Sequence, residues 1–273
     1  MKIISTNPKK KITGIEGWKP LIEEKHWKAG RSAQTLAEFI LKTKPLGLQL
    51  DNILKGITNT IPGLDEIIFD EAYPEFEVRF DNYQNGRKHD LGLFGRTKVG
   101  KNIFVGIEAK VDEEFGNTIE IEYANAVNAR KNGEYTNKPE RIKALMQDFF
   151  SSQIKKPYST LRYQLLHGLA GTVKHVKAPY AGPDYMLFVV LVFKTKGFGT
   201  KVDYDSEKGE KNYSDYLDFI NSLMAIDINK NQSIIPYVRD NRVYEISLKD
   251  GKIVYSAYIE VDAKNLNGLT NFS

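Results

Sequence analysis

Residues 88–110, KHDLGLFGRTKVGKNIFVGIEAK, constrain the fold most strongly, because two apolar runs flank a polar turn in this segment. Side chains alternate between the two faces of a strand, so Glu108 and Lys110 share one face of the second run. The segment 96–101 is polar with a glycine near its end, which is typical of a hairpin turn. Antiparallel pairing through that turn brings Asp90, at the start of the first run, beside Glu108 and Lys110. We therefore expect two carboxylates and an amine at one edge of a sheet.

These three groups suit metal-assisted chemistry. Asp90, Glu108 and the backbone carbonyl of Ala109 can bind a hard cation such as Mg²⁺, which keeps water and substrate phosphate as its remaining ligands. The cation polarises a phosphoryl group and activates a water molecule, while a lysine such as Lys110 positions that water or stabilises the developing negative charge. The alternative is that Glu108 and Lys110 form only a solvated strand end.

The order Asp90, hairpin, Glu108-x-Lys110 resembles the PD-(D/E)xK (restriction-endonuclease-like) nuclease superfamily. The segments GRSAQTLAEF, DLGLFGR, GIEAKVDEEFG and LRYQLLHGLAGT also resemble a family of uncharacterised bacterial proteins in that superfamily, over residues 27–195. This resemblance implies a Mg²⁺-dependent phosphodiesterase with Asp90, Glu108 and Lys110 as catalytic residues, in which Mn²⁺ substitutes for Mg²⁺. The role of the residues after 195 stays open.

The same resemblance points to further site residues. In such nucleases the helix before the core strands can lend a metal ligand, here Glu38, and Glu77 on the preceding strand is a second acidic candidate. A helix beside the Glu-x-Lys strand often carries polar side chains to the site, which makes Arg162 and Gln164 candidates for contacting nucleic acid or positioning water. For Glu38 and Glu77 the alternative is a solvated surface position.

Apolar periodicity predicts an α/β fold. A helix begins near Ser32 and cannot continue through Pro45, and the apolar run 185–193 is short enough for a buried strand. A further helical stretch follows the acidic residues 112–114. The other predicted helices cover residues 46–57, 139–150, 159–177 and 214–224, and the other predicted strands cover 75–80, 90–95, 103–110, 233–238, 242–248 and 252–261.

The order helix, three strands, helix, strand is the αβββαβ core of the restriction-endonuclease-like fold. We therefore expect a mixed central sheet flanked by helices, with extra N-terminal helices. A C-terminal β-hairpin is predicted at the Asp250-Gly251 turn. In this interpretation residues 1–29 are a basic arm without clear periodicity, 30–240 are the nuclease core, and 241–273 are a hairpin and tail packed on the core.

Charge is unevenly distributed along the chain. The net charge is +6 for residues 1–50, −6 for 51–120, +6 for 121–180 and −2 for the rest, which sums to +4. Basic segments on either side of an acidic one suit a protein that holds a cation while binding a polyanion, although a patchy surface is the alternative. The absence of cysteine excludes disulfides and thiolate metal sites. The longest apolar run is about half the length of a membrane-spanning helix, so a cytoplasmic protein without a membrane partner is expected.

The function expected from these features is a Mg²⁺-dependent nuclease that hydrolyses DNA, in defence against foreign DNA or in repair. The alternative is a catalytically silent nuclease-fold module that binds nucleic acid or a protein partner. The intact Asp90, Glu108 and Lys110 favour the nuclease. No recognition helix or zinc finger is evident, so sequence specificity, RNA as the substrate, endo or exo action and a homodimer all stay open.

Overall fold

The computed structural model describes the chain except for residues 7, 65, 84, 151–157, 175–181, 196–203, 231 and 263–273. Within the described residues, nine strands form one mixed sheet in the order β2-β1-β3-β4-β5-β6-β9-β8-β7. The strands are β1 (Lys2–Thr6), β2 (Lys9–Lys11), β3 (Ile68–Val78), β4 (Arg87–Arg96), β5 (Asn102–Lys110), β6 (Tyr185–Lys194), β7 (Ile226–Asp227), β8 (Val238–Ser247) and β9 (Ile253–Asp262). The α-helices are α1 (Ile15–Trp18), α2 (Ser32–Lys42), α3 (Leu48–Thr58), α4 (Ile119–Lys131), α5 (Lys138–Phe149), α6 (Tyr163–Val173) and α7 (Ser206–Ser222), and 3₁₀ turns cover Lys19–Leu21, Glu24–His26 and Tyr158–Thr160.

The centre of the sheet is the part that the sequence predicts best. Strands β3, β4 and β5 form an antiparallel meander, and the predicted hairpin pairs Arg96 with Asn102 and Leu91 with Ile107. Strand β6 lies beside β5 in parallel orientation. It is buried on both faces because helices cover each side, and this explains why residues 186–193 are uniformly apolar.

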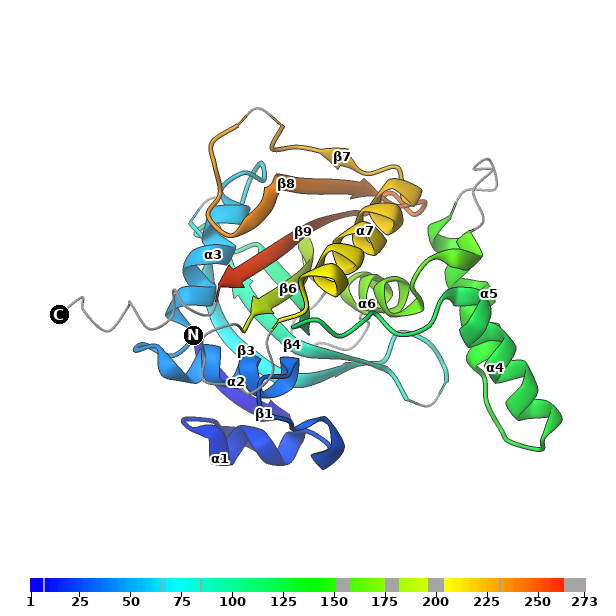
Figure 1. Ribbon diagram of the computed structural model, residues 1–273. Coiled ribbons are helices and arrows are strands. Elements are labelled where there is room, and N and C mark those ends of the chain that lie inside the picture. Colours follow the sequence, from blue (N-terminus) through cyan, green and yellow to red (C-terminus); the bar gives the residue numbers. More distant parts are fainter. Residues whose placement is uncertain are drawn as a thin grey trace.

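Helices cover the sheet on both faces, giving an α/β architecture with a large mixed sheet (Figure 1). One hydrophobic core joins α2 and α3 to the face that carries Ile107 and Leu187. A second core joins α4, α5, α6 and α7 to the opposite face, which carries Phe188 and Val190. Figure 1 shows α4 and α5 as a helical pair that reaches away from the sheet. Among the helices in the described part of the chain, none has the length and apolarity needed to span a membrane.

The N-terminal segment is not an irregular arm. Strand β1 pairs with β3, and β2 pairs with β1 at the edge of the sheet. Ile3 and Trp18 belong to the core. The sequence prediction fails because a short lysine-rich strand lacks the apolar alternation that identifies a strand. Consecutive lysines at a sheet edge have a structural reason, since charged edges prevent pairing with other chains.

The C-terminal hairpin is part of the sheet. Strand β9 lies between β6 and β8, in parallel register with β6, so residues 238–262 complete the sheet instead of packing on it. The strand predicted over residues 233–238 is wrong, because β8 begins only at its last residue. Helix α7 begins eight residues before the predicted start at Ser214, and Asp205 caps it. The predicted end of α6 at Lys177 lies outside the described residues.

Substitutions in β9 test its position in the sheet. Ile259 is fully buried between the two neighbouring strands, so Ile259→Ala is expected to lower the free energy of unfolding by about 2–5 kcal/mol. Ile253→Ala in the same strand is the matched control, because that side chain is 40% exposed and a change below about 1 kcal/mol is expected there. Urea denaturation measures both. Equal small effects would mean that β9 is a peripheral appendage.

Candidate functional site

Three carboxylates occupy neighbouring strands at one level of the sheet. Glu75 of β3 lies opposite Asp90 of β4, because the pairs Pro74 with Leu91 and Phe76 with His89 flank them. Continuing the β4–β5 register by one residue beyond Leu91 and Ile107 places Asp90 opposite Glu108. We call Glu75, Asp90 and Glu108 the carboxylate row. Neighbouring strands are about 4.8 Å apart, so the row brings three acids into a small region.

Strands β4 and β5 stop pairing through their backbones at this row. Their paired residues end at Leu91 and Ile107, and the Asp90 side chain then takes over, since its Oδ2 accepts a hydrogen bond of 2.6 Å from the Ala109 amide. An extended residue directs its N–H and C=O towards the same neighbouring strand, so the Ala109 carbonyl also faces the gap beside Asp90. Half-buried Asp90 therefore lies where the backbone pairing of β4 with β5 ends.

Glu108 is the most enclosed acid of the row, with 1% of its side chain exposed. Lys110 Nζ donates to Glu108 Oε1 at 2.6 Å, and Gln164 Nε2 of α6 donates to the same oxygen. Arg87 donates from Nη2 to Oε2. A buried carboxylate needs such partners, because an unpaired charge in the interior costs several kcal/mol. Glu108 thus has both oxygens engaged by three donors.

Within the carboxylate row, Glu75 has a left-handed backbone conformation and a raised pKa. Its φ of 50° lies in the left-handed region, which costs a non-glycine residue on the order of 1 kcal/mol or more and recurs at functional sites. Burial, and after it the nearby negative charge of Asp90, raise the pKa of Glu75 to about 7. The two acids therefore repel each other in the absence of a cation.

Two buried cations face the carboxylate row. Burial lowers the pKa of Lys110, while the charges of Asp90 and Glu113 oppose that shift. Burial likewise lowers the pKa of Arg87, and Asp90 and Glu75 oppose it. Both cations therefore depend on the acids for their charged state, and the row and its cations form one electrostatic unit.

Two glycines of α6 let the helix lie close to the sheet, Gly171 over Arg87 and Gly168 over Phe188. A Cβ atom on Gly171 would lie 2.8 Å from Cγ of Arg87 and 2.8 Å from Nε2 of His89. A Cβ atom on Gly168 would lie 2.8 Å from the Phe188 ring. The HGLAGT segment therefore has no side chains at two positions where α6 crosses the site. This close approach lets Arg87 reach Glu108 from below the helix that also supplies Gln164.

The structure places the predicted site residues in two groups. Asp90, Glu108 and Lys110 lie together as expected, and Gln164 reaches Glu108 from α6. Arg162 does not join them, because it precedes α6 and binds Asp215 at 2.8 Å and the Gly116 carbonyl at 2.6 Å. It therefore ties α6 to α7, and its predicted contact with phosphate or water has no support here.

The two additional acidic candidates have other partners. Glu38 accepts hydrogen bonds from Gln34 and Lys42 of its own helix, at 2.8 and 2.9 Å. Glu77 accepts from the Gly86 amide at 3.0 Å and from Arg79 at 3.3 Å. These contacts correspond to the surface alternative. Their roles as metal ligands stay predictions.

The donor set fits Mg²⁺ only in a restricted way. Within the described residues, no three His, Asp or Glu side chains converge in a manner that could hold a metal ion. Mg²⁺, however, is commonly held by one or two carboxylates, with water and substrate phosphate completing its octahedron. Asp90 keeps Oδ1 for such a ligand, and the Ala109 carbonyl and Glu75 lie beside it. Glu108 can contribute only if one of its present donors moves.

Sequence reasoning missed Glu75 and Arg87. Glu75 looks like a solvated residue in the alternating pattern EFEVRF, and nothing in that pattern indicates a left-handed backbone. Arg87 looks like part of a polar loop before the predicted strand, whereas β4 begins there. A usable signal was the pair of glycines in HGLAGT, which indicates that something bulky passes close to that helix.

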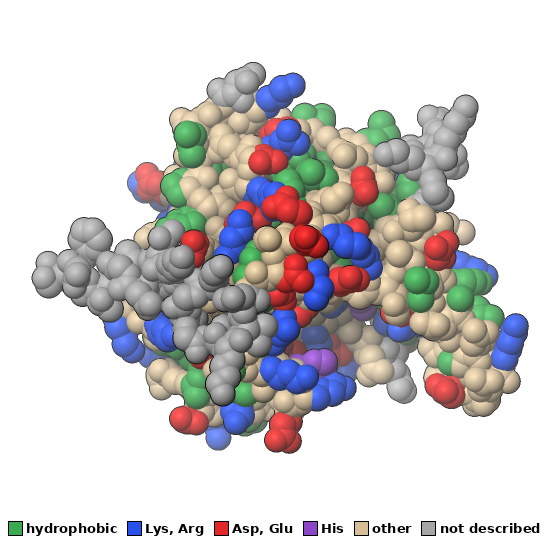
Figure 2. Space-filling model, in the orientation of Figure 1, with side chains coloured by type: hydrophobic (Ala, Val, Ile, Leu, Met, Phe, Trp, Pro, Cys, Tyr) green, Lys and Arg blue, Asp and Glu red, His purple; other side chains and the backbone are tan. Residues whose placement is uncertain are grey.

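Figure 2 shows the charge pattern on the face seen in Figure 1. Lys, Arg, Asp and Glu side chains intermix in a band across the middle of this face. Charges of opposite sign also pair within the described residues, for example Arg239 with Glu260 and Arg31 with Asp112. On this face the basic segments of the sequence do not merge into one continuous basic surface.

The raised pKa of Glu75 predicts a pH-dependent stability difference. Glu75→Gln removes the charge and keeps the shape of the side chain. Well below pH 4.5 the wild type and the variant should be about equally stable, because the acid is protonated in both folded and unfolded states. Between about pH 4.5 and 7 the unfolded carboxyl ionises while burial and Asp90 keep the native one protonated, so the wild type loses stability relative to the variant until both states are ionised above about pH 7. The variant should then be more stable, by about 1–3 kcal/mol at pH 8 in EDTA.

Denaturant titrations of both proteins from pH 4.5 to 8 measure this difference. Glu71→Gln is the control, since Glu71 lies in the same strand and hydrogen-bonds Tyr73. A stability difference for Glu75→Gln that does not change with pH would show that Glu75 and Asp90 do not repel each other.

Comparison with known proteins gives a family and no activity. A family model described as a domain of unknown function (DUF6946) matches residues 11–252. The match covers most of the chain, including every member of the carboxylate row, so the chain belongs to this family. No curated protein matches. No solved structure matches either.

Proposed function

We propose that this member of the DUF6946 family is a Mg²⁺-dependent nuclease that hydrolyses phosphodiester bonds of DNA. The observation that carries the proposal is the carboxylate row beside Lys110 and Gln164 at the place where β4 and β5 separate. Acids that repel each other are costly to keep together without a cation. Their arrangement is therefore better explained by a ligand than by stability.

The chain topology supports a restriction-endonuclease-like core. Helices α2 and α3 precede the meander β3–β4–β5, and α6 leads to β6. β6 lies parallel to β5. That is the αβββαβ order expected from the sequence, with α4 and α5 inserted before α6. Fold alone does not establish activity, so the proposed activity depends on the side chains of the site.

Each residue of the site has a chemical task in this proposal. Asp90, the Ala109 carbonyl and Glu75 would hold Mg²⁺, which supplies charge neutralisation at the phosphate and activation of water. Lys110 presents an ammonium group at the row and can stabilise the negative charge that develops on a phosphoryl oxygen. Gln164 fixes Glu108 by its amide and so orients the acid that lies closest to Lys110.

One observation favours the catalytically silent alternative. Arg87, Lys110 and Gln164 together occupy both oxygens of Glu108, so this acid is already neutralised by the protein. A module that only binds nucleic acid or a protein could retain the same network as a buried salt bridge. The two functions differ in their response to metal, because only the nuclease requires the row to bind a cation.

Single substitutions of the proposed site residues test the activity. Asp90→Asn, Glu108→Gln and Lys110→Ala are each expected to lower cleavage of circular single- or double-stranded DNA in Mg²⁺ by at least about 100-fold. Asp70→Asn is the matched control, because Asp70 is an acid of β3 that pairs with Arg96 at 3.1 Å, and its rate should be unchanged. Melting curves establish that each variant is folded. Full turnover by Asp90→Asn would exclude this site.

Metal-induced stabilisation tests the site without a substrate. With a dissociation constant on the order of 1 mM, about 10 mM Mg²⁺ should stabilise the native state by about 1.4 kcal/mol, or about 3 °C in melting temperature. Asp90→Asn should lose this gain. Monovalent salt of equal ionic strength controls for general screening. The same gain in Asp90→Asn and the wild type would mean that the cation binds elsewhere.

A further inference from the structure

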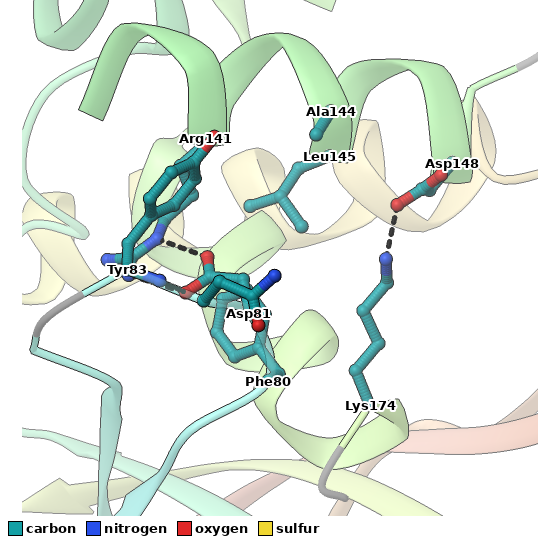
Figure 3. A pocket seen from close by; sticks show the side chains of 9 residues that line it. Phe80, Asp81, Tyr83, Arg141, Ala144, Leu145, Asp148 and Lys174 are labelled. Carbon is teal, nitrogen blue, oxygen red and sulfur yellow. Dashed lines mark hydrogen bonds and ion pairs between the residues drawn. The ribbon is translucent and has the colours of Figure 1, made fainter. Parts of the chain in front are cut away.

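A cavity of about 350 Å³ lies between the β3–β4 connection, α5 and the end of α6 (Figure 3). Its apolar wall consists of Phe80, Ala144 and Leu145, and Tyr83 lies at one side. The remaining lining residues are polar: Asp81, Asn82, Arg141, Asp148 and Lys174. The volume is at the small end of ligand-binding pockets, which typically measure about 300–1,000 Å³.

The charges around this cavity neutralise one another. Arg141 binds both oxygens of Asp81, at 2.7 and 2.9 Å, and also donates to the Asn85 carbonyl at 2.9 Å. Lys174 binds Asp148 at the opposite end (Figure 3). A phosphate would have to compete with two carboxylates for these cations. A neutral ligand with hydrogen-bonding edges meets no such competition, so the lining favours an uncharged group.

The walls suit a flat ring. The Arg141 guanidinium lies 5.5 Å from the Phe80 ring centre and 5.6 Å from that of Tyr83, so two aromatic rings and a planar cation lie together at this side of the cavity. The apolar side chains of Ala144 and Leu145 face the same space. Asn82 supplies a donor and an acceptor at the edge. A heteroaromatic ring combines the flat apolar faces and the polar edge that these walls require.

Aromatic contacts and helix α6 connect the cavity to the carboxylate row. Phe80 packs against the His167 ring at 5.4 Å, and His167 stacks on Tyr163 at 5.2 Å. Burial, with the charge of Arg87 adding to it, lowers the pKa of His167 well below its ordinary value, so this ring is neutral at pH 7. Gln164, which holds Glu108, and Lys174 of the cavity belong to one helix and its cap. They are separated by about 15 Å, or about four stacked nucleotides.

We propose that this cavity binds an unpaired nucleobase, and that the substrate of the carboxylate row is therefore a strand with at least one base out of the duplex. This inference rests on the proposed function, because the base belongs to the strand that the nuclease would cleave. The cavity itself would also accept the base of a free nucleotide. The base stacks on the aromatic side of the cavity and bonds Asn82 through its edge. Duplex DNA without unpaired bases cannot fill it.

Ala144→Trp tests this assignment because Ala144 is exposed on α5, so a larger side chain fills the cavity without entering the core. Ala124→Trp on α4 is the matched control, since Ala124 is also exposed and does not line the cavity. Binding of a fluorescent single-stranded oligonucleotide, its duplex and an abasic strand is measured in EDTA by anisotropy. Saturation-transfer NMR with nucleoside monophosphates provides a second arm that requires neither metal nor cleavage.

The expected result is tighter binding of the single strand than of the duplex or the abasic strand, with about a tenfold loss in Ala144→Trp and none in Ala124→Trp. Nucleoside monophosphate signals that vanish in Ala144→Trp, while no strand binds in EDTA and the wild type cleaves no strand in Mg²⁺, would retain the cavity as a free-nucleotide site and reject the proposed nuclease. Equal strand affinity in Ala144→Trp and the wild type would overturn the cavity assignment and leave the nuclease intact. Absence of both nucleoside and strand binding by the wild type would also overturn it.

Discussion

The buried charge of Glu108 is the interaction on which the rest of the site depends. With 1% of its side chain exposed, this carboxylate is tolerated because Arg87, Lys110 and Gln164 bind it from three elements. Arg87 in turn requires the small face of α6 at Gly171. Removing one partner of such a buried pair costs about 3–5 kcal/mol, since the remaining charge stays in the interior. The network therefore couples β4, β5 and α6.

Stability alone does not explain this network. Buried ion pairs are often no more stabilising than apolar residues of the same volume, so a fold gains little from keeping them. The left-handed backbone at Glu75 and its proximity to Asp90 add further cost. A cation at Asp90 and Glu75 would relieve that repulsion, and the proposed nuclease gives the costs a common cause. The silent alternative explains Glu108 and its donors, but it gives no reason for Glu75.

The sequence was informative where one pattern determined one structure. Alternation and a polar turn placed Asp90 beside Glu108, and the uniformly apolar run 185–193 identified the central parallel strand. Prediction from the sequence failed where tertiary contacts determine the local structure. Lysine-rich β2 is a strand because β1 pairs with it, and β9 enters the sheet because it pairs with β6 on the side opposite β5. Glu75 could not be recognised either, since its backbone conformation and its opposition to Asp90 follow from strand register.

Binding of Mn²⁺ to the carboxylate row decides between the two functions, because a catalytic site of this kind requires a cation and a structural salt bridge does not. Mn²⁺ is titrated into the protein in complex with an uncleavable phosphorothioate strand. Electron paramagnetic resonance measures the free Mn²⁺ at each step. Saturable binding is expected in the wild type, with a dissociation constant on the order of 1 mM or below, and is expected to be lost in Asp90→Asn. Free Mn²⁺ that is unaffected by the wild-type complex, or lowered equally by Asp90→Asn, would contradict this expectation.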